Sequence, residues 1–148
     1  KNMFFHEAQM RNYCAFTCDA LDYFELPPPA IIKPMRLWTG KQLFNLLMRP
    51  STYSRSITSD VDMLINTELG ESQYEKKGDG DLKRGRYMCP QDSYVCIRNS
   101  ELMCGCLGKA TLGAGSKDGL FYVMLRDCDA ETAADRMTRL LEFCGRWV

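Results

Sequence analysis

Hydrophobic positions recur at helical spacing at both ends of the chain. Near the N-terminus, Phe4 and Ala8 begin a series that predicts one or two amphipathic helices. The final segment gives the clearest helix, because a single apolar stripe runs along it and Asp135 and Arg139 form an i,i+4 pair on the predicted outer face. The stripe consists of Ala133, Met137, Leu140, Leu141, Cys144 and Val148.

A helix and its connector can be located between these ends. Thr39, with Gln42 three residues later, is a capping-box signature, and Pro50 disfavours helix at the residue before it. The prolines at 27–29 exclude a helix interior or a central strand, which predicts an extended connector. A polyproline ligand is the alternative for the same segment.

Apolar and polar residues alternate in the middle of the chain. Residues 61–65 predict a strand, and residues 94–104 predict a hairpin whose turn lies over 98–101. Residues 66–86 are polar and glycine-rich and carry several Lys and Arg, so we expect a mobile loop there. A solvated loop and a nucleic-acid contact within a larger assembly are both open interpretations of this charge.

A glycine-rich stretch, LGKATLGAGSKDG over residues 107–119, follows the hairpin. The next segment, LFYVML, suits either a helix or a buried strand, and we favour a helix from Leu120 because Ser116 or Asp118 can cap it. The glycines suit a tight corner, while Lys109 and Lys117 beside a helix start suit a phosphate. On the residues alone, the structural corner is the preferred interpretation.

These elements predict one α+β domain over residues 1–148, with short antiparallel strands, flanking helices and a long C-terminal amphipathic helix. The chain carries 19 Lys and Arg against 19 Asp and Glu, which excludes a globally basic nucleic-acid binder. No apolar run approaches the roughly 20 residues of a membrane helix, so no membrane partner is expected. We take Lys1 as a cut point and the chain as a fragment of a larger protein.

The cysteines and carboxylates of the chain do not form a recognisable metal-binding pattern. Eight cysteines lie mostly in apolar stretches without a Cys-x-x-Cys pair, which predicts buried free thiols and a reducing compartment. Cys104 and Cys106 lack a second pair with zinc spacing. The carboxylate pairs at 60–62 and 79–81 lack a partner in an ordered element. We therefore expect no metal site.

No catalytic residue is predicted either. His6 is the only histidine and has no nearby nucleophile in the sequence. The Gly40-Lys41 pair lacks the earlier glycine and the following Ser or Thr of a phosphate-binding loop.

Three stretches change this picture: PPPAIIKPMRLWTGKQLFNLLMRP, DSYVCIRNSELMCGCLGKATLGAGSKDGLFYVMLRD and AADRMTRLLEFC. They resemble the largest subunit of eukaryotic DNA-directed RNA polymerases in its pore domain, and within that family they look most like RNA polymerase III. LWTGKQ followed by KATLG is the specific signal. The match covers about residue 26 to the C-terminus except the 66–86 loop, and it continues more weakly into the N-terminal helices.

The resemblance implies a non-catalytic role in a nuclear nucleotidyltransferase. The domain would line the channel through which nucleoside triphosphates enter and a backtracked RNA 3′ end leaves. It implies Mg²⁺ held by aspartates upstream of Lys1 and Zn²⁺ elsewhere in the complete subunit, so this fragment alone should be inactive. The implied partners are the other subunits, especially the second-largest, together with template DNA, RNA and nucleoside triphosphates.

The resemblance also directs attention to four residues of the glycine-rich stretch as the nucleotide or RNA path: Lys109, Thr111, Gly113 and Lys117. Polymerase II carries a second lysine after the first, where this chain has Ala110, which leaves a single charge. Two alternatives are kept. In one, the same domain of another polymerase class serves mainly as a docking surface between subunits, and in the other the chain is a stand-alone nucleotide-binding protein.

Overall fold

The structure, a computed structural model, describes residues 3–17, 26–48, 65–71, 94–113, 115, 117–128 and 130–148. The chain divides into two compact units. Unit 1 comprises Lys1–Met63 with Ala130–Val148, and unit 2 comprises Leu64–Asp129. The described residues contain five helices and two small antiparallel sheets, so the predicted α+β class is confirmed.

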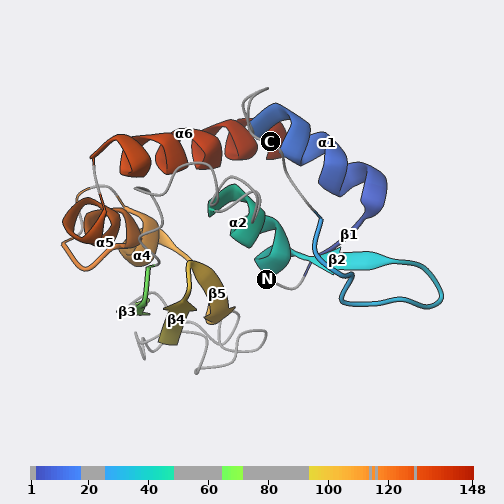
Figure 1. The fold of residues 1–148 in the computed structure, drawn as a ribbon, viewed down its shortest axis with the longest axis horizontal. Coiled ribbons are helices and arrows are strands. Elements are labelled where there is room, and N and C mark those ends of the chain that lie inside the picture. Colours follow the sequence, from blue (N-terminus) through green and yellow to red (C-terminus); the bar gives the residue numbers. More distant parts are fainter. Residues whose placement is uncertain are drawn as a thin grey trace, which may run out of the picture. The chain divides into compact units, whose positions relative to one another are not determined.

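Unit 1 begins with a two-stranded sheet. Strand β1 (Phe4–His6) pairs antiparallel with β2 (Leu37–Thr39), and the buried Phe5 and Trp38 lie opposite each other. Helix α1 (Glu7–Thr17) follows β1 directly, which confirms a helix in the N-terminal segment. Both α1 and α2 (Gly40–Met48) contact the long helix α6 (Ala130–Trp147), shown in red in Figure 1.

The capping box predicted at the start of α2 is present. The Thr39 amide donates to Gln42 Oε1 at 2.9 Å, and the Gln42 amide donates to Thr39 Oγ1 at 3.3 Å. The proline connector is irregular, as predicted, and its carbonyls accept hydrogen bonds from the structure that follows. Trp38 Nε1 donates to Pro27 O at 2.8 Å, and Gln42 Nε2 donates to Pro28 O at 2.9 Å.

Aromatic rings from three elements close the core of unit 1. Their centroids lie 5.2–6.1 Å apart, mostly in edge-to-face arrangements. The four rings are Phe5, Tyr13, Phe143 and Trp147.

Helix α6 has the predicted length and type, but its buried face differs from the predicted stripe. Leu141 is 66% exposed and Cys144 is exposed, whereas Phe143 packs into the core. Arg139, predicted to face outward, is only 4% exposed and pairs with Asp135 at 3.2 Å. The prediction was right for Ala133, which is buried, and for Met137 and Leu140, which are half-buried, but wrong for the C-terminal part of the stripe, where Phe143 takes the core position.

Unit 2 is built on a three-stranded antiparallel sheet in the order β3 (Thr67–Gly70), β4 (Tyr94–Arg98), β5 (Glu101–Cys104). The predicted hairpin β4–β5 is confirmed. Its two turn residues, Asn99 and Ser100, have φ angles of 51° and 61°, as a type I′ turn requires. Leu69, Val95, Ile97 and Leu102 form the buried side of this sheet.

A third strand lies within the segment that was predicted to be a loop. We expected a strand over 61–65 and a loop from 66, but β3 spans Thr67–Gly70 and Glu71 after it is fully buried. The sheet forms here because backbone pairing with β4 outweighs the polar composition on which the loop prediction relied. Residues 61–64 and 72–86 lie outside the described residues.

The LFYVML segment is a helix, α5 (Leu120–Asp127), as favoured from the sequence, and buries Leu120, Phe121, Val123 and Met124. Its N-cap is Gly119 with no side-chain cap, so the predicted cap at Asp118 was wrong, and Ser116 lies outside the described residues. In the described part of the chain, no helix has the length and apolar character needed to span a bilayer.

Candidate functional site

The glycine-rich stretch leaves the sheet at a residue that must be glycine. Gly105 has a φ of +96°, which side-chain-bearing residues rarely adopt. A Cβ there would also clash with the carbonyl oxygen of Tyr94 and would lie 2.7 Å from Val95 Cα. The chain therefore turns tightly against β4 before it enters the candidate site.

A single helical turn, α4 (Lys109–Leu112), forms the centre of the stretch. Its ends are closed by backbone bonds, from Leu112 N to Gly108 O at 2.9 Å and from Gly113 N to Lys109 O at 2.8 Å. At Gly113 the φ of −65° is ordinary, but a Cβ would lie 2.5 Å from Lys109 O. Gly113 is thus explained by close packing against the helical turn.

The side chain of Thr111 points into the protein. Thr111 is 0% exposed, and its Oγ1 accepts a 2.8 Å bond from the Gly108 amide. Its amide and hydroxyl donate to Glu71 Oε2 at 3.3 Å and 3.2 Å. Glu71 is also 0% exposed. Sequence reasoning missed Glu71, because it is 40 residues away in a segment that looked like a loop.

Of the four residues indicated by the resemblance, the structure leaves two at the surface. Lys109 and Lys117 are exposed, Gly113 is half-buried, and Thr111 is buried. The two lysines are therefore available to a solute, while Thr111 and Gly113 shape the turn that carries Lys109. This arrangement fits a structural corner with charged side chains on its outer side.

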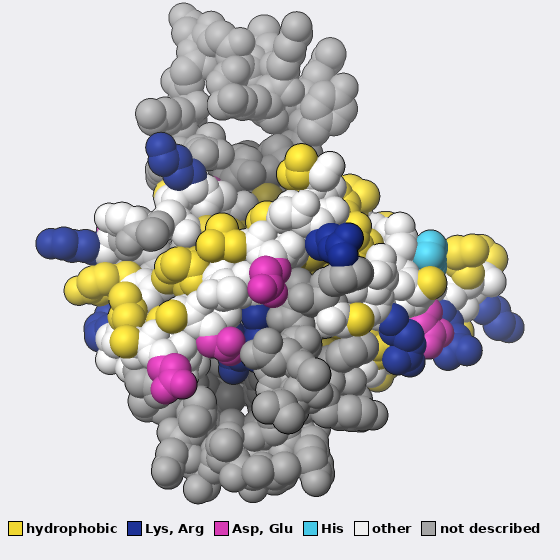
Figure 2. Space-filling model, turned by 90° about the horizontal axis from the view of Figure 1, so that it is seen from above, with side chains coloured by type: hydrophobic (Ala, Val, Ile, Leu, Met, Phe, Trp, Pro, Cys, Tyr) yellow, Lys and Arg dark blue, Asp and Glu magenta, His cyan; other side chains and the backbone are white. Residues whose placement is uncertain are grey.

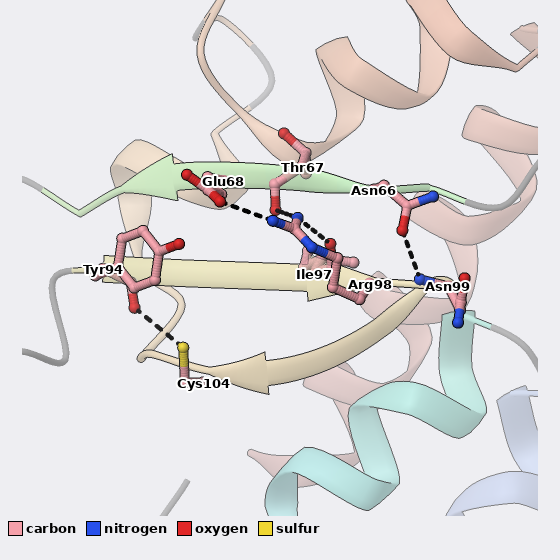
Figure 3. Close-up of polar contacts among 8 residues, drawn as sticks. All are labelled: Asn66, Thr67, Glu68, Tyr94, Ile97, Arg98, Asn99 and Cys104. Carbon is pink, nitrogen blue, oxygen red and sulfur yellow. Dashed lines mark hydrogen bonds and ion pairs between the residues drawn. The ribbon is translucent and has the colours of Figure 1, made fainter.

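The exposed side of the three-stranded sheet carries a separate polar cluster, drawn in Figure 3. Arg98 Nη2 lies 2.7 Å from Glu68 Oε1 on the neighbouring strand. The hydrogen bonds from Arg98 and Tyr94 lower the pKa of Glu68, and the bond to Glu68 raises the pKa of Tyr94 to about 12. The pKa of Arg98 is raised by the same hydrogen bond to Glu68. Since all three groups are solvent-exposed, this cluster orders the surface more than it stabilises the fold.

A second concentration of charge lies in unit 1 around His6. On the face shown in Figure 2, basic side chains gather near this histidine, the only one in the chain, together with hydrophobic side chains. Arg11, Lys33 and Arg36 of unit 1 are exposed, and Arg11 pairs with Glu7 at 3.0 Å. No sequence motif predicted a site in this part of the chain.

Comparison with known proteins supplies the family. A family model described as RNA polymerase Rpb1, domain 3, matches residues 1–148. The chain belongs to this family. It is 40% identical, over all 148 residues, to DNA-directed RNA polymerase III subunit rpc1 from Dictyostelium discoideum and to the subunit of that name from Schizosaccharomyces pombe. The human DNA-directed RNA polymerase III subunit RPC1 is 46% identical over 115 residues, 78% of this chain.

The Rpb1 domain 3 chain spans only a small part of these relatives. It covers 9% of the Dictyostelium protein, 10% of the Schizosaccharomyces protein and 7% of the human protein. The resemblance to the largest polymerase subunit, inferred from the sequence, is confirmed by these matches.

The residues of this domain were compared with what a metal site requires. Across the described ranges, no group of three or more His, Cys, Asp and Glu is arranged to hold a metal ion. The candidate carboxylate pairs at 60–62 and 79–81 lie outside the described residues.

The cysteines differ in part from the prediction of buried thiols. Those described are free thiols, and Cys14 is buried in the core of unit 1. Cys104 and Cys144 are exposed, so the prediction was wrong for these two. Cys104 ends the outer strand β5, and Cys144 lies on the solvent side of α6 because Phe143 occupies the core side.

Proposed function

We propose that this chain is the pore domain of the largest subunit of a nuclear DNA-directed RNA polymerase III. The observation that carries the class is the 40% identity, over the whole chain, to two subunits of that name. In the assembled enzyme the domain lines the channel for nucleoside triphosphate entry and for extrusion of a backtracked RNA 3′ end. Its partners are the other subunits, especially the second-largest, with template DNA and RNA.

The domain takes no part in forming the phosphodiester bond; it provides positively charged side chains along the path of the nucleotide or RNA. The reaction of the complete enzyme is two-metal phosphodiester formation, whose Mg²⁺ ligands we assign to chain upstream of Lys1. Lys109 and Lys117, exposed on the glycine-rich stretch, attract the phosphates of the moving nucleotide or RNA. A lysine ammonium is a flexible, strongly hydrated point charge, which suits transient attraction rather than tight capture.

The class is tested by purifying the complex through a tag on the full-length chain. We expect a multisubunit polymerase that makes transfer RNA and other short transcripts. A polymerase that makes messenger or large ribosomal transcripts would retain the pore-domain role and reject the class. A lone protein that binds triphosphate would instead support the stand-alone nucleotide-binding alternative.

The phosphate path is tested in that complex with Lys109→Glu. Reversing one exposed charge beside the path should raise the KM for nucleoside triphosphates about two- to fivefold and leave kcat nearly unchanged, because the lost attraction acts on binding. The matched control is Lys33→Glu, the same reversal at an exposed residue of unit 1. If Lys109→Glu leaves KM unchanged while apolar surface substitutions block assembly, the domain is a docking surface and not a phosphate path.

A further inference from the structure

The carboxyl group of Glu71 is bonded to the helical turn that carries Lys109. Glu71 Oε2 accepts from the amide of Thr111 at 3.3 Å and from its hydroxyl at 3.2 Å. Both residues are completely buried. Amides in the first turn of a helix have no acceptor within the helix, so Glu71 supplies one from outside α4.

The hydroxyl of Thr111 links this bond to the backbone. It accepts from the Gly108 amide at 2.8 Å, and it has one hydrogen, which can go to Glu71 Oε2 at 3.2 Å or to Gly108 O at 3.2 Å. Without the Glu71 carboxyl, the hydroxyl would turn to Gly108 O and the Thr111 amide would lose a buried acceptor. The turn would then lose both hydrogen bonds to Glu71, the residue that follows strand β3.

The space for the carboxyl is reserved by a glycine. A Cβ at Gly108 would lie 2.6 Å from Glu71 Oε2. The φ of −150° at Gly108 is one that other residues adopt, so a glycine is required there for room and not for backbone freedom.

The segment that carries Glu71 and the segment that leads into α4 both contact strand β4 at Tyr94. Gly70, which precedes Glu71, pairs with Tyr94, and Gly105, which leads into the turn, packs against the Tyr94 carbonyl. Strand β4 therefore holds Glu71 and the start of the turn in a fixed relation.

We propose that Glu71 is a positioning residue that acts through Lys109. Lys109 is the first residue of α4, two residues before Thr111, so fixing Thr111 fixes the Cα of Lys109 and the direction in which its exposed side chain leaves the surface. The inference rests on the proposed function of Lys109 in the phosphate path. It adds a residue that itself touches no nucleotide, because it is buried.

The test is a double-mutant cycle in the purified polymerase, with Glu71→Ala, Lys109→Ala and the two combined. Each single variant should raise the KM for nucleoside triphosphates about two- to fivefold and retain kcat. If Glu71 acts through Lys109, the double variant should be no worse than the more affected single variant. Glu71→Gln, which keeps an acceptor oxygen of the same reach, should restore most of the lost affinity.

Additive effects in the double variant would overturn the inference, since Glu71 would then act independently of Lys109. An unchanged KM in Glu71→Ala, with a raised KM in Lys109→Ala, would overturn it and leave the proposed function intact. An unchanged KM in Lys109→Ala would reject the phosphate path and this inference with it. If Glu71→Ala does not assemble, the same cycle is run with Thr111→Val, which removes the bonded hydroxyl at nearly constant shape and is judged by the same additivity.

Discussion

At the scale of single residues, the surroundings of three glycines show why the glycine-rich stretch requires glycine. A Cβ at Gly105, Gly108 or Gly113 would meet an oxygen of the protein itself, belonging to Tyr94, Glu71 and Lys109 respectively. A phosphate nest presents successive backbone amides to an anion, whereas these glycines approach oxygens. They are therefore explained by close packing, so the proposed attraction of phosphate would come from the exposed lysines.

The polar cluster on the sheet gives a residue-scale prediction about pH. The pKa of Tyr94 is raised to about 12 by its bond to Glu68, so this contribution to stability is fully present below the unfolded pKa of about 10 and is lost as the pH rises through 12. Removing the carboxylate in Glu68→Gln should lower the pKa of Tyr94 toward 10. Tyrosinate absorbance of the 148-residue chain, compared with that of Tyr94→Phe to isolate this ring, measures the change.

The matched control for this prediction is Glu131→Gln, which removes an exposed carboxylate from α6 in unit 1. Glu131→Gln should leave the titration of Tyr94 near pH 12 unchanged. A Tyr94 titration unchanged by Glu68→Gln would mean that the bond between these two side chains is not formed in solution. At the acid end the sign is opposite, because the lowered pKa of Glu68 gives stability that is lost as the pH falls through that pKa.

At the scale of elements, the features that could be predicted from the sequence are those determined by residues close together in the chain. The capping box joins Thr39 and Gln42, which are three residues apart, and the hairpin turn is formed by the consecutive residues Asn99 and Ser100. The burial of Glu71 depends on pairing between strands and on a bond across 40 residues, which no local pattern encodes. The C-terminal part of the buried face of α6 likewise follows from which ring fills the core.

The capping box gives the element-scale prediction. Thr39→Ala removes the oxygen that accepts the Gln42 amide, so the free energy of unfolding should fall by about 0.5–2 kcal/mol. Thr138→Ala is the control within the same unit. Its hydroxyl donates to Ala134 O at 2.9 Å in the interior of α6, where alanine is the better helix former, so this change should be neutral or stabilising.

Thermal unfolding of the two variants, followed by circular dichroism, decides the matter. Thr39→Ala should lower Tm and Thr138→Ala should not. An equal fall in Tm in both variants would mean that the loss of side-chain volume explains the effect. The reciprocal hydrogen bonds at the start of α2 would then not contribute to stability.

At the scale of the whole molecule, the charge of the domain is balanced, with 19 basic and 19 acidic residues. A chain without net charge produces little long-range steering, so the attraction that we propose for a nucleotide should be local. The domain also spans about a tenth of its first relatives or less.

Because Lys109 is solvent-exposed, the attraction that we propose for it should depend on salt. The Debye length is about 10 Å at 0.1 M ionic strength and about 3 Å at 1 M, so added salt screens an exposed charge from a passing triphosphate. The ratio of KM between Lys109→Glu and wild-type polymerase should therefore fall toward one as salt is raised, with the Lys33→Glu ratio near one throughout. Comparing each variant with wild type at the same salt removes the effect of salt on template binding. A Lys109 ratio that stays constant would show that the substitution acts by distorting α4, which would assign the role of Lys109 to shape rather than to charge.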